Sequence, residues 1–177
     1  RAIEFIRTES VQSDLPFALV VSMNPPHTGY ELVPDAYKRL YDSLDVEALA
    51  RQKPYIPEKG TPEGDYFRAN IRNYYACITG VDEQVGRIVQ ALKNCGLFEN
   101  TLLVFTSDHG VCMGGHGVEG KNVFYEEAMR IPMICCWKNK LHPQQTDLPV
   151  AFADLYPTML SLMGMKDQIP STVQSYD

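Results

Sequence analysis

Residues 74–134 read YYACITGVDEQVGRIVQALKNCGLFENTLLVFTSDHGVCMGGHGVEGKNVFYEEAMRIPMI. Apolar residues recur at helical spacing as far as Gly96, and the run Leu102–Phe105 then predicts a strand. Asp108 and His109 come next, followed by the glycine-rich loop, residues 110–120. Adjacent side chains on a strand point to opposite faces, so Asp108 and His109 can contribute to the same site only if the strand ends and a loop begins there. The stretch therefore predicts a helix, a strand and a site loop, in that order.

The residues around this loop predict a metal-assisted site for an anionic ester. Asp108 offers a hard carboxylate oxygen that suits Ca²⁺ or Mg²⁺, and the neutral imidazole of His109 extends the choice to Mn²⁺ or Zn²⁺. Lys121 lies thirteen positions after Asp108 and suits an anion held against the cation, because its charge would stabilise negative charge in the transition state.

Strand-like and helix-like patterns alternate along the whole chain. Strands are predicted at 16–23, 101–106 and 131–137, and helices at 1–9, 34–42, 65–95, 122–129 and 153–163. Residues 24–64 are rich in Pro, Gly and Tyr and are predicted to be mostly irregular, which a compact domain tolerates where the segment is functional. The alternation predicts an α/β layered fold with a largely parallel sheet.

Composition limits the classes of protein to consider. A chain of 177 residues can build one sizeable core. The net charge of −6 and the lack of a basic block argue against nucleic-acid binding. No apolar run approaches the roughly 20 residues that a membrane span requires. The five cysteines contain no CxxC pair, so a structural zinc site is not predicted.

Three parts of the chain together resemble the sulfatase family within the alkaline phosphatase superfamily. The quoted stretch shares its helix xxDxxVGxIxxxL, its strand ending in T-S-D-H-G, the run G-x-H-G-x-x-x-K, and Y-E-E followed by R-I-P. Residues 17–27 are similar to a strand that leads into a Pro-His turn, and residues 153–160 to a D-x-x-P-T-L helix. The resemblance covers most of residues 15–165.

The resemblance implies a fold and a domain organisation. An alkaline phosphatase-like layered fold is expected, with a largely parallel sheet flanked by helices. Residues 1–177 would form part of one catalytic domain, a middle-to-late fragment without the amino-terminal nucleophile region and the carboxy-terminal subdomain. Residues 24–64 would help to shape the substrate pocket. By family resemblance the source compartment is expected to be periplasmic, lysosomal or secreted.

The resemblance also implies roles for individual residues. Asp108 and His109 would bind the metal, with Ca²⁺ as the first expectation and Mg²⁺ or Mn²⁺ as alternatives. Lys121 would grip the sulfate oxygens, and His27 would contact the sulfuryl group or protonate the leaving oxygen. His116 would either bind the substrate or hydrogen-bond a loop carbonyl. The nucleophile would be a formylglycine made from Cys or Ser in C/S-x-P/A-x-R, a motif that none of the five cysteines matches, so it is expected outside this chain.

The function implied is hydrolysis of a sulfuric ester with release of inorganic sulfate, from a small-molecule or carbohydrate substrate. This chain alone is expected to be inactive, because it lacks the nucleophile and part of the ligand set. Two alternatives stay open. One is a phosphodiesterase or phosphonate monoester hydrolase of the same superfamily, and the other is a non-catalytic scaffold that binds a polyanion.

Overall fold

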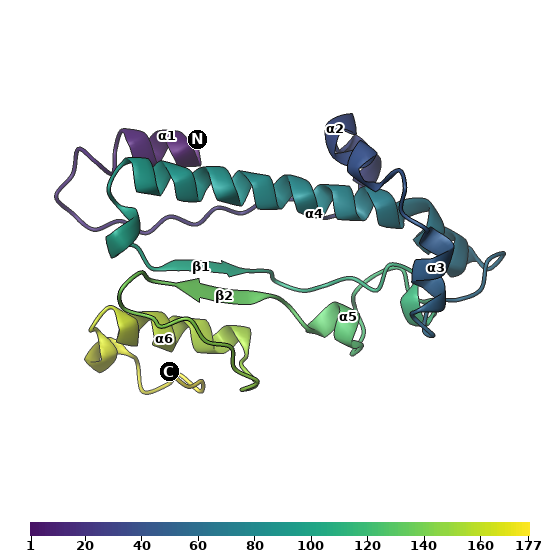
Figure 1. Cartoon of the computed structure of the whole chain (residues 1–177). Helices are drawn as coiled ribbons and strands as arrows, with labels where there is room; N and C mark the ends of the chain where they lie inside the picture. Colours follow the sequence, from purple (N-terminus) through teal and green to yellow (C-terminus); the bar gives the residue numbers. More distant parts are fainter. The chain divides into compact units, whose positions relative to one another are not determined.

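A computed structural model describes residues 1–177, which divide into two compact units, Arg1–Leu141 and His142–Asp177 (Figure 1). The helices of the first unit are α1 (Ala2–Arg7), α2 (Asp35–Lys38), α3 (Val46–Arg51), α4 (Pro62–Asn94) and α5 (Glu126–Met129). Its strands are β1 (Leu103–Thr106) and β2 (Met133–Cys136), and the second unit contains α6 (Leu155–Leu162). Short 3-10 helices lie at Tyr30–Leu32, Arg39–Tyr41, Phe98–Asn100, Gly115–Gly117, Phe152–Asp154 and Lys166–Gln168.

The long helix α4 organises the first unit. It begins at Thr61, whose hydroxyl accepts a bond from the backbone N–H of Gly64 at 3.2 Å, and Pro62 occupies its first turn. It ends before Gly96, which has a left-handed φ of 70°. Its 33 residues extend roughly 50 Å. The helix predicted at 65–95 is thereby confirmed, and α1 and α3 lie beside opposite ends of it (Figure 1).

Two hydrophobic clusters bury one face of α4. Near its start the buried residues are Tyr30, Val46, Ala50, Phe67, Ile71, Cys77 and Met113. Near its end they are Ile6, Ala91 and Leu92. Because Met113 belongs to the glycine-rich loop, the first cluster packs that loop and residues 30–50 on the same helix.

Residues 24–64 are more regular than the sequence predicts, since they contain α2, α3 and two 3-10 helices. Asp45 explains the helix that was missed, because its carboxylate caps α3 by accepting a bond from Ala48 N at 2.9 Å. Arg68 of α4 holds the segment in place through Glu47 Oε1 at 2.9 Å and the carbonyl of Pro57 at 3.0 Å.

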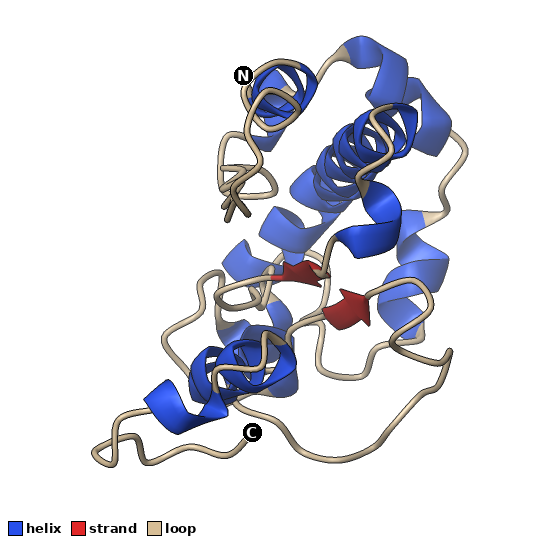
Figure 2. Cartoon of the chain, turned by 90° about the vertical axis from the view of Figure 1, so that its left-hand side faces the viewer, coloured by secondary structure: helices blue, strands red, loops and turns tan.

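The strands β1 and β2 form a two-stranded antiparallel sheet, with Leu103 opposite Cys136 and Thr106 opposite Met133 (Figure 1). They are the two red arrows in Figure 2. The parallel pairing predicted from the alternation of strands and helices is therefore absent between these two strands. The connection through the glycine-rich loop and α5 begins at the carboxyl end of β1 and brings the chain back to that same end, where β2 starts. Two strands connected in this way pair antiparallel. Both strands were predicted from their apolar runs.

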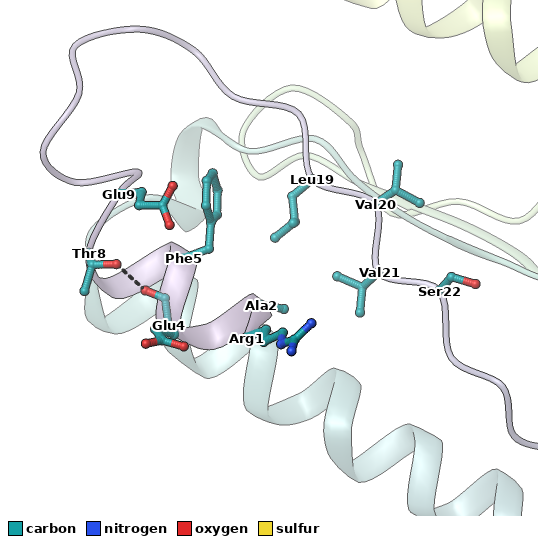
Figure 3. Close-up of a pocket in the computed structure, with 10 residues that line it drawn as sticks. All are labelled: Arg1, Ala2, Glu4, Phe5, Thr8, Glu9, Leu19, Val20, Val21 and Ser22. Carbon is teal, nitrogen blue, oxygen red and sulfur yellow. Dashed lines mark hydrogen bonds between the residues drawn. The ribbon is translucent and has the colours of Figure 1, made fainter.

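Residues 16–23, predicted as a strand, form no regular secondary structure and pair with no strand of this chain. Its apolar side chains are largely exposed, and that of Val20 is 91% exposed. Figure 3 shows a pocket between this segment and α1, lined by Phe5, Leu19 and Val21. A buried strand requires a pairing partner for its backbone and cover for its side chains, and this chain supplies no partner and covers only part of the segment, chiefly Phe17.

In the second unit, α6 (Leu155–Leu162) confirms the helix predicted at 153–163. The end of the chain folds back toward this helix. Asp154 accepts bonds from the backbone N–H groups of Ala151 at 2.8 Å and Tyr176 at 3.1 Å. Asp177 accepts a bond from Ser161 at 2.6 Å and pairs with Lys166 at 2.7 Å. None of the helices in the chain combines the length and apolar character that a membrane crossing requires.

Replacing Phe67 tests how far the structure depends on the cluster around α4. Its side chain is 2% exposed, so Phe67→Ala in the full-length protein should lower the free energy of unfolding by about 3–5 kcal/mol. Phe124 is 94% exposed, so Phe124→Ala should change it by no more than about 0.5 kcal/mol. Urea unfolding measures both, and equal losses would contradict the assignment of the core.

Candidate functional site

Asp108 and His109 lie just after the end of β1, where the sequence predicts them. The carboxylate of Asp108 accepts a bond from the backbone N–H of His109 at 2.9 Å. The hydroxyl of Ser107 donates to the carbonyl of His109 at 2.7 Å. These local bonds turn the chain out of the strand, so that the two adjacent side chains come together.

The imidazole of His109 is oriented toward Asp108. Its Nδ1 lies 2.9 Å from the carbonyl oxygen of Gly110. Since a carbonyl only accepts, neutral His109 carries its proton on Nδ1, and Nε2 keeps a free lone pair. That Nε2 lies 3.3 Å from Oδ2 of Asp108. Two adjacent ligands of one cation at about 2.1–2.4 Å are separated by about this distance, so the pair fits a shared metal ion.

Asp108 is ionised at neutral pH. Its small burial acts to raise the pKa of its carboxyl group. The backbone N–H of His109, the charge of the His109 imidazole and, more weakly, the charge of Lys121 together outweigh that effect and lower the pKa. The side chain is 80% exposed, which leaves its oxygens accessible to a cation.

The donor set within this chain is incomplete for a metal ion. No group of three or more His, Cys, Asp or Glu side chains is arranged to hold one. Asp108 and His109 would thus provide two ligands at most, whereas Ca²⁺ takes six to eight oxygen ligands and Mg²⁺ takes six. The chemistry of the pair fits a hard or borderline cation, and further ligands would have to come from outside this chain.

Lys121 follows the glycine-rich loop and is half-buried. Its charge contributes to the lowered pKa of Asp108, which places the ammonium within electrostatic reach of the carboxylate. It forms no ion pair within this chain. The loop before it is closed by backbone bonds from Cys112 to Gly120 and from Gly114 to Val118, both of 2.9 Å. Lys121 is therefore held at the exit of a compact turn and keeps its charge unpaired.

The structure does not join His27 to the other predicted site residues. The imidazole is exposed, and its Nδ1 lies 3.0 Å from the hydroxyl of Thr28. A turn with a cis bond between Pro25 and Pro26 precedes it. No hydrogen bond or ion pair links it to Asp108 or Lys121, so its catalytic role stays a prediction.

His116 lies in a cluster of side chains that sequence patterns did not reveal. Its ring is stacked between those of Tyr55 and Tyr125, and its Nε2 lies 3.1 Å from Oε2 of Glu127. The ring thus bonds a carboxylate and not the loop carbonyl expected as one alternative. Tyr125 and Glu127 stand in the quoted Y-E-E motif and could have been suspected. No signal in the sequence pointed to Tyr55.

Burial and hydrogen bonds have opposite effects on Glu127. Burial acts to raise the pKa of its carboxyl group, but bonds from its own backbone N–H, from Tyr55 and from His116 outweigh it and lower the pKa. Nearby Cys112 is buried. Burial, and after it the negative charge of Glu127, raises the pKa of the Cys112 thiol. An ionised carboxylate on α5 therefore lies near a protonated thiol in the glycine-rich loop.

Known proteins share this sequence over most of its length. The sulfatase family model matches residues 1–165. The chain belongs to the sulfatase family. This sulfatase chain is 34% identical to the endo-4-O-sulfatase of Bacteroides thetaiotaomicron over 98% of its own length, which corresponds to 34% of the length of that relative. It therefore spans about a third of the curated relative it matches.

Solved structures share the fold of the sulfatase chain. A crystal structure of yidJ, a candidate sulfatase of Bacteroides fragilis, is 64% identical, with a TM-score of 0.95 over 99% of this chain and 38% of that chain. The phosphonate monoester hydrolase of Agrobacterium radiobacter is 30% identical, with a TM-score of 0.71 over 92% of this chain and 38% of that chain. The predicted alkaline phosphatase-like α/β fold is confirmed, with this chain as a part of it.

Gly110 tests how closely the site loop must approach α5. A Cβ at Gly110 would lie 2.0 Å from the carbonyl oxygen of Glu127, whereas one at Gly120 would meet nothing within 4 Å. We therefore expect Gly110→Ala to destabilise the full-length protein by about 1–3 kcal/mol through overpacking, and Gly120→Ala to change stability by less than about 0.5 kcal/mol. Thermal unfolding of the two variants measures the difference, and equal midpoints would disprove the close approach.

Proposed function

We propose that a full-length protein carrying this chain is a sulfatase that hydrolyses a sulfuric ester and releases inorganic sulfate. The observation that carries the proposal is the pair of ligand atoms, Asp108 Oδ2 and His109 Nε2, at 3.3 Å from one another. The unpaired charge of Lys121 lies within electrostatic reach of this pair. A cation at this pair, with the positive charge of Lys121 nearby, would stabilise the negative charge that develops on the oxygens of a sulfate ester.

The cation proposed at Asp108 and His109 is Ca²⁺, with Mg²⁺ or Mn²⁺ as alternatives. Carboxylate oxygen is a preferred ligand of all three ions. Ca²⁺ is placed first because of the family resemblance, and the imidazole nitrogen keeps Mn²⁺ as an alternative. When bound, the cation would withdraw charge from the sulfuryl oxygens. The remaining ligands, and a formylglycine as nucleophile, are proposed to come from a part of the protein outside this chain.

The other residues have roles that follow from their chemistry. Lys121 would bind the sulfuryl oxygens and stabilise the charge that develops on them. His27, as an exposed imidazole, would contact the sulfuryl group or donate a proton to the leaving oxygen once a substrate brings it into reach. His116 remains a candidate for substrate contact by resemblance, although its ring is engaged with Tyr55, Tyr125 and Glu127.

The proposed substrate is a small-molecule or carbohydrate sulfate ester. Residues 24–64 would line part of its pocket, since Arg68 and the first hydrophobic cluster fix this segment beside the glycine-rich loop. This chain by itself is proposed to be inactive, because it offers two metal ligands and no nucleophile.

A phosphonate monoester hydrolase is the second candidate. The structure from Agrobacterium radiobacter supports it, because its likeness extends over 92% of this chain. Sulfuryl and phosphoryl centres present similar oxyanion geometry, and a cation with a lysine would stabilise either. A non-catalytic polyanion-binding scaffold is the third candidate, and it would need the charges but no nucleophile.

Two measurements on the full-length protein separate these candidates. Peptide mass mapping should show an aldehyde at a Cys or Ser in C/S-x-P/A-x-R, and assays should show faster cleavage of a sulfate ester than of a phosphonate ester. A chelator should abolish cleavage, and added Ca²⁺ should restore it. Faster phosphonate cleavage would favour the second candidate. A protein that binds polyanions without any turnover would favour the third.

Lys121→Ala tests the proposed anion grip. Removing one charge that stabilises the transition state should lower kcat by about 10²- to 10³-fold in the full-length protein, as the loss of an oxyanion-hole donor does. Lys93→Ala serves as the matched control, because Lys93 is an exposed lysine in the last turn of α4. Steady-state kinetics with one sulfate ester give both values, and a near-normal rate for Lys121→Ala would refute the role.

A further inference from the structure

We propose that His116 is a positioning residue, which holds the glycine-rich loop and the Lys121 that follows it by lying between Tyr55 and Tyr125 with its ring bonded to Glu127. The inference rests on the proposed function for its activity readout. The ring contacts from which it is drawn do not depend on any reaction.

Both faces of the His116 ring are covered. The ring centroids of His116 and Tyr55 are 4.7 Å apart with an interplanar angle of 10°, and those of His116 and Tyr125 are 3.8 Å apart with an angle of 7°. Nε2 is engaged with Glu127 at 3.1 Å, and the side chain is 25% exposed. A substrate could reach only the Nδ1 edge of such a ring, so the contacts favour holding over substrate binding.

His116 connects its own loop to two other segments, one of which, at Tyr55, is far away in the sequence. Its backbone N–H donates to the carbonyl of Tyr55 at 2.7 Å, and Tyr55 lies between α3 and α4. Tyr125 and Glu127 lie at the start of α5. The ammonium of Lys53 donates to the hydroxyl of Tyr55 at 3.1 Å, which secures that tyrosine from its other side. The His116 ring therefore connects the glycine-rich loop to the segment between α3 and α4 and to the start of α5.

The loop transmits the position of His116 to Lys121. His116 has a left-handed φ of 57°, a conformation that a non-glycine residue keeps only where its surroundings enforce it. The bonds from Cys112 to Gly120 and from Gly114 to Val118 close the loop around it. Gly120 immediately precedes Lys121, so a displaced His116 would shift the ammonium. Misplacement of a catalytic group by about 1 Å can lower a rate by about 10²-fold.

Two variants test this role, and each removes one partner of the bond between the His116 ring and the Glu127 carboxylate. His116→Phe keeps a ring that can stack between the tyrosines but cannot bond Glu127, and Glu127→Leu removes the carboxylate. Because Glu127 also accepts a bond from Tyr55, Glu127→Leu removes more than His116→Phe does, and the double variant should be no worse than Glu127→Leu alone. His142→Phe is the matched control, since His142 is exposed and lies in the second unit.

Hydrogen exchange on the full-length protein gives a readout that needs no turnover. We expect the amides of Cys112 and Gly114 to exchange at least about tenfold faster in His116→Phe and Glu127→Leu, because a lost bond to a carboxylate shifts a local opening equilibrium by about that factor. The same two variants should lower kcat by about 10- to 100-fold. The factor should be equal for a small aryl sulfate and a sulfated disaccharide, with KM unchanged.

Unchanged exchange, combined with a KM raised for one ester and not the other, would overturn the proposal and assign His116 to substrate contact. A full-length protein that cleaves no sulfate ester would contradict the proposed function. In that case faster exchange would still support the positioning role, and exchange equal to that of His142→Phe would still refute it.

Discussion

Burial of one face of α4 is the constraint on which the remainder of the first unit depends. A helix of this length is stable only if its apolar side chains are covered, and two separate sets of residues cover them. Met113 belongs to one of these sets, so the hydrophobic packing that stabilises the helix also anchors the glycine-rich loop. A Cβ at Gly114 would lie 2.2 Å from the carbonyl of Glu63, so loop and helix touch through their backbones as well. The site is thus positioned by the core.

The residues of the candidate site are positioned in two ways, by local hydrogen bonds and by tertiary contacts. Asp108 and His109 are arranged by their sequence neighbours, since Ser107, Gly110 and the His109 amide supply the bonds that orient them. The geometry of this pair therefore needs only the end of β1 and the residues next to it. Lys121, by contrast, depends on the closure of a loop and on contacts with Tyr55 and α5. The geometry of the proposed metal ligands is therefore determined locally, whereas the position of the lysine proposed to bind the anion depends on tertiary structure.

The same distinction explains what the sequence could predict. Helix α4, the strands β1 and β2 and helix α6 follow from local periodicity, and Asp108, His109 and Lys121 follow from motif spacing. The cluster around His116 could be predicted only in part, because Tyr125 and Glu127 stand in the Y-E-E motif whereas Tyr55 reaches His116 through a tertiary contact. The segment 16–23 has the apolar composition of a buried strand, but strand formation depends on a pairing partner, and none lies within this chain. Antiparallel pairing of β1 and β2 was also missed, because alternation alone does not show where a connection ends.

The burial of Cys112 has a consequence for metal selectivity. A thiolate in this loop would be a soft ligand close in sequence to Asp108 and His109, and it would draw zinc or copper toward the site. Its buried position and the neighbouring carboxylate of Glu127 keep the sulfur protonated, and a protonated thiol is neither a good metal ligand nor an easily oxidised nucleophile. If the proposed cation binds at Asp108 and His109, the packing of the loop would thus keep the thiol of Cys112 from competing as a ligand, and burial also shields the sulfur from oxidants.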